Sequence, residues 1–260
     1  MNESLQTSSV QIDEVITLCR RLRLKYVREQ LEEVVLTAKA QRWEPTEILR
    51  CLLEAEAKGR DTSTMETRRH KAHFPAGKTF DCWDESQSSI QASSQRSLRS
   101  LEWVSRSENL VVCGPAGTGK SHLLEAIGHE AINHSLSVAW FAIEDLGVLV
   151  RRHRIDDTVS KAFATLSNIS LVIVDDIGLV PISQDCAEGL YRLIDSAYER
   201  RSLAISSNLH PSGFDQLMDK TIASALVDRL LHHAHVIVTE GGSVRLADAT
   251  SGKGVVPLAT

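Results

Sequence analysis

The sequence lacks the features of membrane, secreted and disulfide-rich proteins. It contains no run of about 18 apolar residues, so no segment is expected to span a membrane. Its first residues, MNESLQTSSV, are polar and lack the apolar core of a signal peptide. The five cysteines are scattered and form no CxxC pair, which argues against a disulfide framework or a zinc ribbon and favours a reducing cytoplasm.

Excess positive charge is also lacking. A net charge of −5 excludes a uniformly basic coat for nucleic acid, so any DNA contact must come from local basic patches. The chain has 260 residues, of which 42% are hydrophobic and 24% charged, as in an ordinary globular protein. This length leaves room for one medium domain and a smaller one.

The N-terminal part has helical spacing of apolar residues. Residues 12–40 show this spacing, and a second helix is expected from Pro45 to Lys58. We therefore expect a small helical N-terminal domain over residues 1–80. Residues 81–108 are rich in Ser and Gln and are interpreted as a linker or entry segment.

From residue 109 onward, short apolar runs alternate with helical stretches. The runs are LVVC at 110–113, VAWFAI at 138–143, LVIV at 171–174, LAISS at 203–207 and VIVT at 236–239. Near-continuous apolar strands separated by helices predict a parallel sheet covered on both faces. We expect an α/β core over residues 109–247 and a flexible tail over residues 248–260.

The first strand leads directly into a phosphate-binding pattern. GPAGTGKS at 114–121 matches GxxxxGK[ST], and a helical stretch follows it. Backbone N–H groups and the start of the helix suit phosphates, Lys120 adds positive charge, and the Ser121 hydroxyl suits Mg²⁺. The strand–loop–helix context argues against a chance match. The predicted ATP-binding residues are Gly114, Pro115, Ala116, Gly117, Thr118, Gly119, Lys120, Ser121 and His122.

Polar residues follow the third and fourth strands. In LVIVDDIG, Asp175 would hold Mg²⁺, directly or through water, and Asp176 would orient or deprotonate the attacking water. Asn208 is suited to hydrogen-bond the γ-phosphate or that water. The plainer alternatives are two turn acids that cap a strand and an ordinary loop asparagine.

Four segments in order, GPAGTGKSHLLEAIG, LVIVDDIG, AISSNL and ALVDRLLHH, resemble the AAA+ ATPases. The resemblance is to the branch of DnaC-type helicase loaders and IstB-type transposon helpers. It is closest to IstB, because the E-x-x-x-R pattern from Glu56 to Arg60 and the stretch KAHFPAGKTFDCWD resemble that family's own. It covers most of residues 12–246. Ala116 replaces a usual proline and Ser121 a commoner threonine, and both changes are chemically mild.

The resemblance implies an ATPase that uses ATP and Mg²⁺, with a five-stranded parallel AAA+ sheet and no C-terminal lid domain. Arg245 is then a poor candidate for the second sensor arginine of such lids. The resemblance also implies that Arg229 is an arginine finger for the ATP site of a neighbouring subunit, so that hydrolysis requires a homo-oligomer. The alternative is an ion pair of Arg229 within the chain, for example with Asp228 or Asp219.

Three histidines follow Arg229 closely. His232 and His235 are placed to share a helical face, but no cysteine or acid near them in the sequence is spaced to complete a tetrahedral metal site.

Two basic clusters are candidates for DNA contact. In this branch of the family the region of the first cluster faces the central nucleic acid, and a solvated helix face is the alternative. Because no recognition helix is evident, we expect non-specific binding of double-stranded DNA through its phosphates. The first cluster is Arg151, Arg152, Arg154 and Lys161, and the second is Arg68, Arg69 and Lys71.

Three functions remain open at this stage. The first is an ATP-dependent helper of transposition that assembles on target DNA and recruits or activates the transposase of the same element. The second is a DnaC-like loader of a replicative helicase. The third, a P-loop kinase of small molecules, is disfavoured because the sequence offers no acceptor pocket or lid arginines and leaves Arg229 without a role. We expect a bacterial, cytoplasmic, DNA-associated protein.

Overall fold

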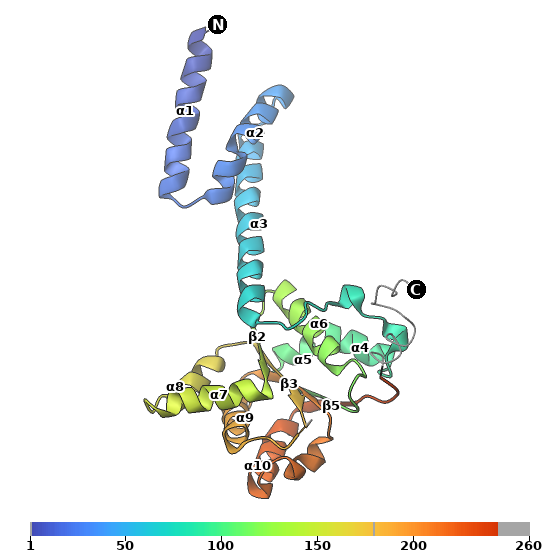
Figure 1. Ribbon diagram of the computed structural model, residues 1–260. Coiled ribbons are helices and arrows are strands. Elements are labelled where there is room, and N and C mark those ends of the chain that lie inside the picture. Colours follow the sequence, from blue (N-terminus) through green and yellow to red (C-terminus); the bar gives the residue numbers. More distant parts are fainter. Residues whose placement is uncertain (1, 179, 244–260) are drawn as a thin grey trace, which may run out of the picture. The chain divides into compact units, whose positions relative to one another are not determined.

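The chain divides into two compact units, residues 1–67 and 68–260, each described here by itself. The structure is a computed structural model that describes residues 2–178 and 180–243, with side chains from Ile12 onward. The division falls inside a helix (Figure 1) and not at residue 80, where the N-terminal domain was expected to end.

In the first unit, the regular elements among residues 2–67 are all helices. They are α1 (Asn2–Arg21), α2 (Lys25–Gln41) and the larger part of α3 (Pro45–Ala72). The helical spacing over residues 12–40 belongs to two helices, because Arg23 between them has a φ of 57°, which an α-helix does not allow. α3 continues beyond Lys58, since residues 60–72 contain no glycine or proline that would end it.

Glu56 of α3 holds the start of α2. Its carboxylate accepts hydrogen bonds from the backbone N–H groups of Tyr26 and Val27 at 2.8 and 3.0 Å. Arg60 donates to the same carboxylate at 2.7 Å and to the carbonyl oxygen of Arg23 at 3.0 Å. Burial raises the pKa of Glu56, but these hydrogen bonds outweigh it and hold the pKa below its usual value. The E-x-x-x-R pattern therefore fixes the turn between α1 and α2.

A five-stranded parallel sheet forms the centre of the second unit, with the order β2-β3-β4-β1-β5 (Figure 1). This confirms the predicted fold class. The strands are β1 (Asn109–Cys113), β2 (Val138–Ala142), β3 (Leu171–Ile177), β4 (Ser202–Ser207) and β5 (Ala234–Val238). β1 and β4 are buried throughout, whereas β5 is an edge strand and partly exposed.

Helices cover both faces of this sheet. α6 (Lys120–Asn133) packs against β3 and β4, and α4 (Ala92–Arg99) lies against α6. On the other face, four helices share one apolar core with the strands (Figure 1). They are α7 (Ile143–Arg154), α8 (Val159–Leu166), α9 (Gln184–Ala197) and α10 (Lys220–Leu231), with the 3-10 helix η3 (Pro211–Gln216) beside α10.

Residues 81–108, predicted as a linker, fold as part of the second unit. They contribute to η1 (Phe80–Cys82) and form η2 (Glu85–Gln87), α4 and α5 (Glu102–Ser105). Gln95 is 2% exposed, accepts from the indole N–H of Trp83 at 2.7 Å and donates to the carbonyl of Ile90 at 2.7 Å. The Ser- and Gln-rich composition concealed these buried contacts.

After β5 the described residues continue to Ser243 and contain no helix. The last part of the predicted core, Arg245 and the predicted tail at 248–260 lie outside the described residues.

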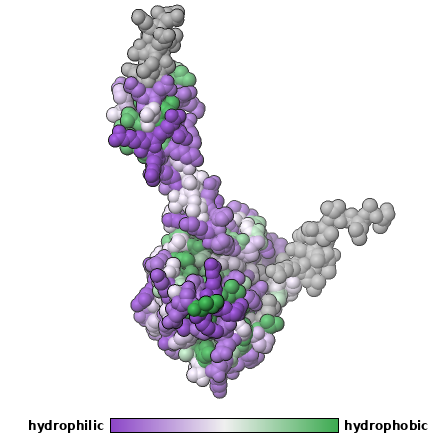
Figure 2. Space-filling model, turned by 60° about the vertical axis from the view of Figure 1, so that its left-hand side comes forward, coloured by the Kyte–Doolittle hydropathy of each residue, from purple (hydrophilic) through white to green (hydrophobic). Residues whose placement is uncertain are grey.

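The surface of the second unit is mainly polar on the face drawn in Figure 2, with small apolar areas between polar ones. Among residues 2–178 and 180–243, no helix combines the length and the apolar character needed to cross a membrane.

Candidate nucleotide site and basic surfaces

The phosphate-binding pattern forms a tight loop between β1 and α6. Gly114, Gly117 and Gly119 all have positive φ values, of 147°, 87° and 88°. A Cβ at Gly114 would collide with the carbonyl oxygen and hydroxyl of Thr239, so only glycine fits where the loop leaves β1. Thr118 closes the loop, because its hydroxyl lies 2.7 Å from that of Thr239 and donates to the carbonyl of Pro115 at 3.0 Å.

Lys120 and Asn208 meet in this site although they are far apart in the sequence. Lys120 is 5% exposed, and its ammonium group donates to the Pro115 carbonyl at 2.8 Å and to Asn208 Oδ1 at 3.0 Å. Asn208 is held at the end of β4 by its backbone N–H, which donates to the carbonyl of Ile177 at 2.8 Å. Its buried Nδ2 has no hydrogen-bond partner among the described residues. A donor in this position suits a phosphate oxygen.

Ser121 and Asp175 provide oxygen atoms side by side. The Ser121 hydroxyl donates to Asp175 Oδ1 at 2.9 Å, and the hydroxyl of Ser206 on β4 donates to the same oxygen. Burial raises the pKa of Asp175, with a smaller contribution from neighbouring Asp176, while the two hydroxyl groups oppose this shift. A hydroxyl and a carboxylate are ligands that Mg²⁺ prefers, so the residues fit the ion.

Asp176 is exposed and has a left-handed backbone, with a φ of 62°. Its N–H donates to Ser206 Oγ at 3.0 Å, and the pairing of β3 with β4 shifts register between Val174 and Ile177. This irregularity turns two successive carboxylates in different directions, one buried and one toward solvent. Ser206 contacts both acids. Sequence reasoning missed it, because a serine inside a strand carries no signal by itself.

The segment before β1 covers the start of α6. The ring of His122 lies 5.0 Å from that of Trp83, edge to face, and its Nε2 lies 3.6 Å from Cys82 Sγ. The pKa of His122 is lowered by burial. Trp83 also lies against Gly119. His122 was predicted, whereas the stretch containing Trp83 was noted only for its family resemblance.

Arg229 pairs within the chain. Its Nε lies 3.2 Å from Asp195 Oδ1, and its guanidinium group lies 5.4 Å from the centre of the Tyr191 ring. The side chain remains 34% exposed. Of the two acids considered from the sequence, Asp219 instead caps the start of α10 by accepting from the N–H groups of Thr221 and Ile222.

Acidic residues of α9 neutralise part of the first basic cluster. Arg154 lies 2.8 Å from both Asp185 and Glu188, and Arg151 lies 3.4 Å from Asp185. Arg152 and Lys161 are exposed. We call Arg151, Arg152 and Arg154 of α7, together with Lys161 of α8, the α7 cluster. This cluster therefore presents less net positive charge than its sequence indicates.

The second basic cluster lies at the end of α3. Arg69 donates to Asn133 Oδ1 at 2.8 Å, and Lys71 is exposed while Arg68 is partly buried. These residues belong to the second unit, not to the N-terminal one in which the sequence placed them.

The chain is similar to proteins of bacterial insertion sequences. A family model described as IstB-like ATP binding protein matches residues 17–251. The insertion sequence IS21 ATP-binding protein of Pseudomonas aeruginosa is 30% identical over 237 residues, which cover 90% of this chain and 89% of that protein. The corresponding protein of insertion sequence IS232 from Bacillus thuringiensis subsp. berliner is 31% identical, covering 87% of this chain and 92% of its own length.

Two solved structures share the fold of this chain. The replication initiator DnaA bound to AMPPCP and single-stranded DNA superposes with a TM-score of 0.53 at 18% identity, covering 69% of this chain and 55% of that one. DnaI superposes with a TM-score of 0.51 at 17% identity, covering 62% of this chain and 90% of its own. At these identities the likeness shows the fold alone.

Proposed function

Because this chain belongs to the family of IstB-like ATP-binding proteins, we propose that it is an ATPase that helps a transposase act on DNA. In this proposal the chain assembles as a homo-oligomer on target DNA and recruits or activates the transposase of the same element. The observation that carries the proposal is the contact of Lys120 with Asn208, which joins the phosphate-binding loop to the end of β4. Relatives named for insertion sequences support the choice of partner.

The residues of the nucleotide site have distinct roles in this proposal. Lys120 and the N–H groups at the start of α6 bind the β- and γ-phosphates, and the amide of Asn208 binds the γ-phosphate or the attacking water. Ser121 and Asp175 hold Mg²⁺, which neutralises phosphate charge during the reaction. Asp176, exposed beside them, orients the attacking water or accepts its proton.

Arg229 acts between subunits in this proposal. It lies on α10, and its guanidinium group pairs with Asp195 of the same chain and not with the nucleotide site of that chain. Guanidinium groups stabilise charge on a transferring phosphoryl group. If Arg229 completes the site of a neighbour, hydrolysis depends on assembly. Its partial exposure supports this role.

DNA binding is assigned to the two basic clusters, with Arg152 and Lys161 as the strongest contributors of the α7 cluster. Contacts of this kind are with phosphates and carry no sequence information. Repetition of a weak cluster in an oligomer gives a stronger total contact through avidity. Because the proposed activity needs both DNA and ATP, we place the chain in the bacterial cytoplasm.

A loader of a replicative helicase is the alternative, because the sequence motifs resemble the branch that also contains the DnaC-type loaders. Gene neighbourhood distinguishes the two, since a helper is expected beside a transposase gene. The direct test combines the purified chain with the transposase encoded by the neighbouring gene. We expect ATP hydrolysis stimulated by duplex DNA, and ATP-dependent capture of the transposase on DNA that Lys120→Ala abolishes. Capture of a replicative helicase and not of the transposase would favour the loader.

A further inference from the structure

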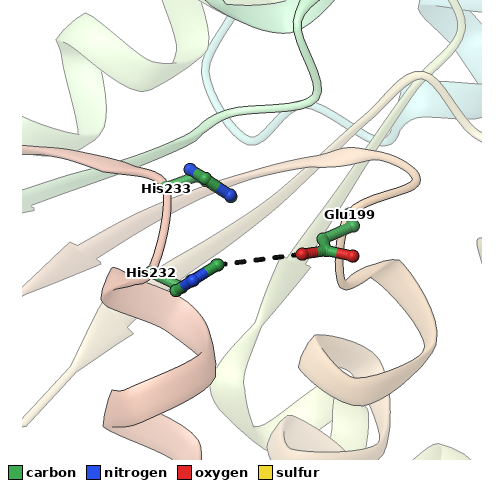
Figure 3. Close-up of side chains that lie close together, drawn as sticks. All are labelled: Glu199, His232 and His233. Carbon is green, nitrogen blue, oxygen red and sulfur yellow. Dashed lines mark ion pairs between the residues drawn. The ribbon is translucent and has the colours of Figure 1, made fainter.

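Three side chains converge at the edge of the sheet opposite the nucleotide site. Glu199 follows α9 just before β4, and His232 and His233 lie between α10 and β5. Figure 3 shows them directed toward a common space. One carboxylate oxygen and one nitrogen from each imidazole lie within 4.8 Å of one another. In the part of the chain that the structure describes, no further group of this kind was found.

The backbone and neighbouring side chains hold these residues in place. The carbonyl oxygen of His233 accepts from the N–H of Asn109 at the start of β1, at 2.7 Å. The Tyr198 hydroxyl lies 3.1 Å from His232 Nδ1, and the two rings are 5.7 Å apart. Glu199 has a left-handed backbone with a φ of 56°, which directs the chain from α9 back toward the sheet. The backbone therefore places the three residues close together, and the Tyr198 contact orients the ring of His232.

We propose that Glu199, His232 and His233 bind a divalent ion of the zinc class. Two imidazoles and one carboxylate form a ligand set suited to Zn²⁺, and a fourth position remains for water or a group from another molecule. Tetrahedral coordination requires ligand atoms about 3.3 Å apart, given metal–ligand distances of about 2.0–2.1 Å. All three side chains are exposed, so small rotations close this gap and the ion enters from solvent.

An ion pair is the simpler use of these groups. Glu199 Oε1 lies 3.9 Å from His232 Nδ1, and the two side chains are about half exposed (Figure 3). Such a pair contributes little in water. It also leaves His233 without a role, although the His233 ring lies 4.2 Å from the His232 ring. A metal uses all three side chains.

The proposed ion would join the ends of two helices that already contact each other. His232 lies three residues after Arg229, and Glu199 lies four residues after Asp195, just beyond the end of α9. The ion would thus lie beside the Arg229–Asp195 pair and hold α9 and α10 in the arrangement that forms this pair. The site itself does not depend on the proposed function.

The test is titration of the full chain, with any purification tag removed, with Zn²⁺ by calorimetry and by competition with a chromogenic chelator. We expect one saturable site per chain. Glu199→Gln and His233→Ala should each lower the affinity at least about tenfold. His235→Ala is the matched control, because His235 is also exposed but lies 2.6 Å from Glu108. Its affinity should equal that of the wild type.

Two further measurements guard against other ligands and against damage to the fold. With Co²⁺, the absorption spectrum should lack a sulfur charge-transfer band, which excludes the exposed thiol of Cys82 as a ligand. Zn²⁺ should raise the melting temperature of the wild type and of His235→Ala but not of Glu199→Gln. Equal affinity in all variants, a sulfur band that Cys82→Ser removes, or the absence of a saturable site would each overturn the proposal.

Discussion

The guanidinium group of Arg229 lies 3.2 Å from the carboxylate of Asp195, so the residue proposed to act on a neighbouring subunit is held within its own chain. The contact links α10 to α9, and Tyr191 of α9 lies under the same guanidinium group. An arginine in this state must leave Asp195 before it reaches a phosphate. A partly exposed ion pair contributes only about 0.2–1 kcal/mol, so breaking the Arg229–Asp195 pair requires little free energy.

We expect Asp195→Asn to favour assembly. The change removes the competing carboxylate, so ATP-dependent oligomerisation should occur at a protein concentration lower by up to about fivefold. Arg229→Ala should bind ATP but hydrolyse it poorly. Sedimentation and phosphate release measure the two effects. Asp228→Asn is the control, because Asp228 is an exposed acid next to Arg229 on α10. If Asp195→Asn lost as much turnover as Arg229→Ala, the pair would have a structural role.

A mixing experiment tests action between subunits. Arg229→Ala has an intact nucleotide site, and Lys120→Ala has an intact Arg229. A mixture should hydrolyse ATP faster than either variant alone, because one chain completes the site of the other. No gain at any ratio, with mixed oligomers demonstrated by cross-linking, would contradict action in trans.

Lys120→Ala should weaken ATP binding itself. A hydrogen bond to a charged group contributes about 1.5–3 kcal/mol, so the affinity should fall roughly 10- to 100-fold in calorimetry. The exposed lysine at the start of α10 provides the control Lys220→Ala, which should bind normally. Retained affinity in Lys120→Ala would remove the phosphate role.

The two adjacent acids should separate metal binding from hydrolysis. Asp176→Asn suits the left-handed backbone at this position, so turnover should fall about a hundredfold or more with little change in the fold. Asp175→Asn should instead raise the Mg²⁺ concentration needed for activity. Turnover measured against Mg²⁺ concentration distinguishes the two variants. Identical curves for both would show that the acids do not have separate roles.

Residues of the α7 cluster that are not paired with acids should contribute more to DNA affinity than those that are paired. Arg154 is already paired with two acids, whereas Arg152 and Lys161 are exposed. Arg152→Gln and Lys161→Gln should weaken duplex binding more than Arg154→Gln, on all sequences alike, and Asp185→Asn should strengthen it. Salt titration measures this, since each lost phosphate contact lowers the slope by about one. Unchanged slopes would identify a solvated helix face.

Glu56 should stabilise the first unit in a pH-dependent way. Its pKa is lowered in the folded state, so its contribution is complete above its ordinary pKa and is lost as the pH falls through the folded value. Glu56→Gln should cost about 1–3 kcal/mol of local stability at neutral pH. Hydrogen exchange of the Tyr26 and Val27 amides reports this, with Glu54→Gln, an exposed acid paired with Arg50, as the control. If the Tyr26 and Val27 amides were equally protected in Glu56→Gln and Glu54→Gln, the proposed stabilising role of Glu56 would be wrong.

Local patterns determined much of this protein. The strand–loop–helix order around Lys120, the two acids after β3 and the parallel sheet follow from contiguous residues, because apolar periodicity and glycine placement act over short stretches. Local composition misled where burial depended on distant segments. Residues 81–108 look like a polar linker, yet Gln95 and Trp83 form buried contacts there.

Only the tertiary structure decided which distant residues meet. Asn208 reaches Lys120 because β4 lies beside β1 in the sheet, an order that the chain sequence does not state. The packing of α10 on α9 brings Asp195 to Arg229, and the same packing brings Glu199 to His232 and His233. No acid near these histidines in the sequence is spaced to complete a metal site. The partner arrives through a helix contact, and such contacts depend on the shape of whole elements and not on residue spacing.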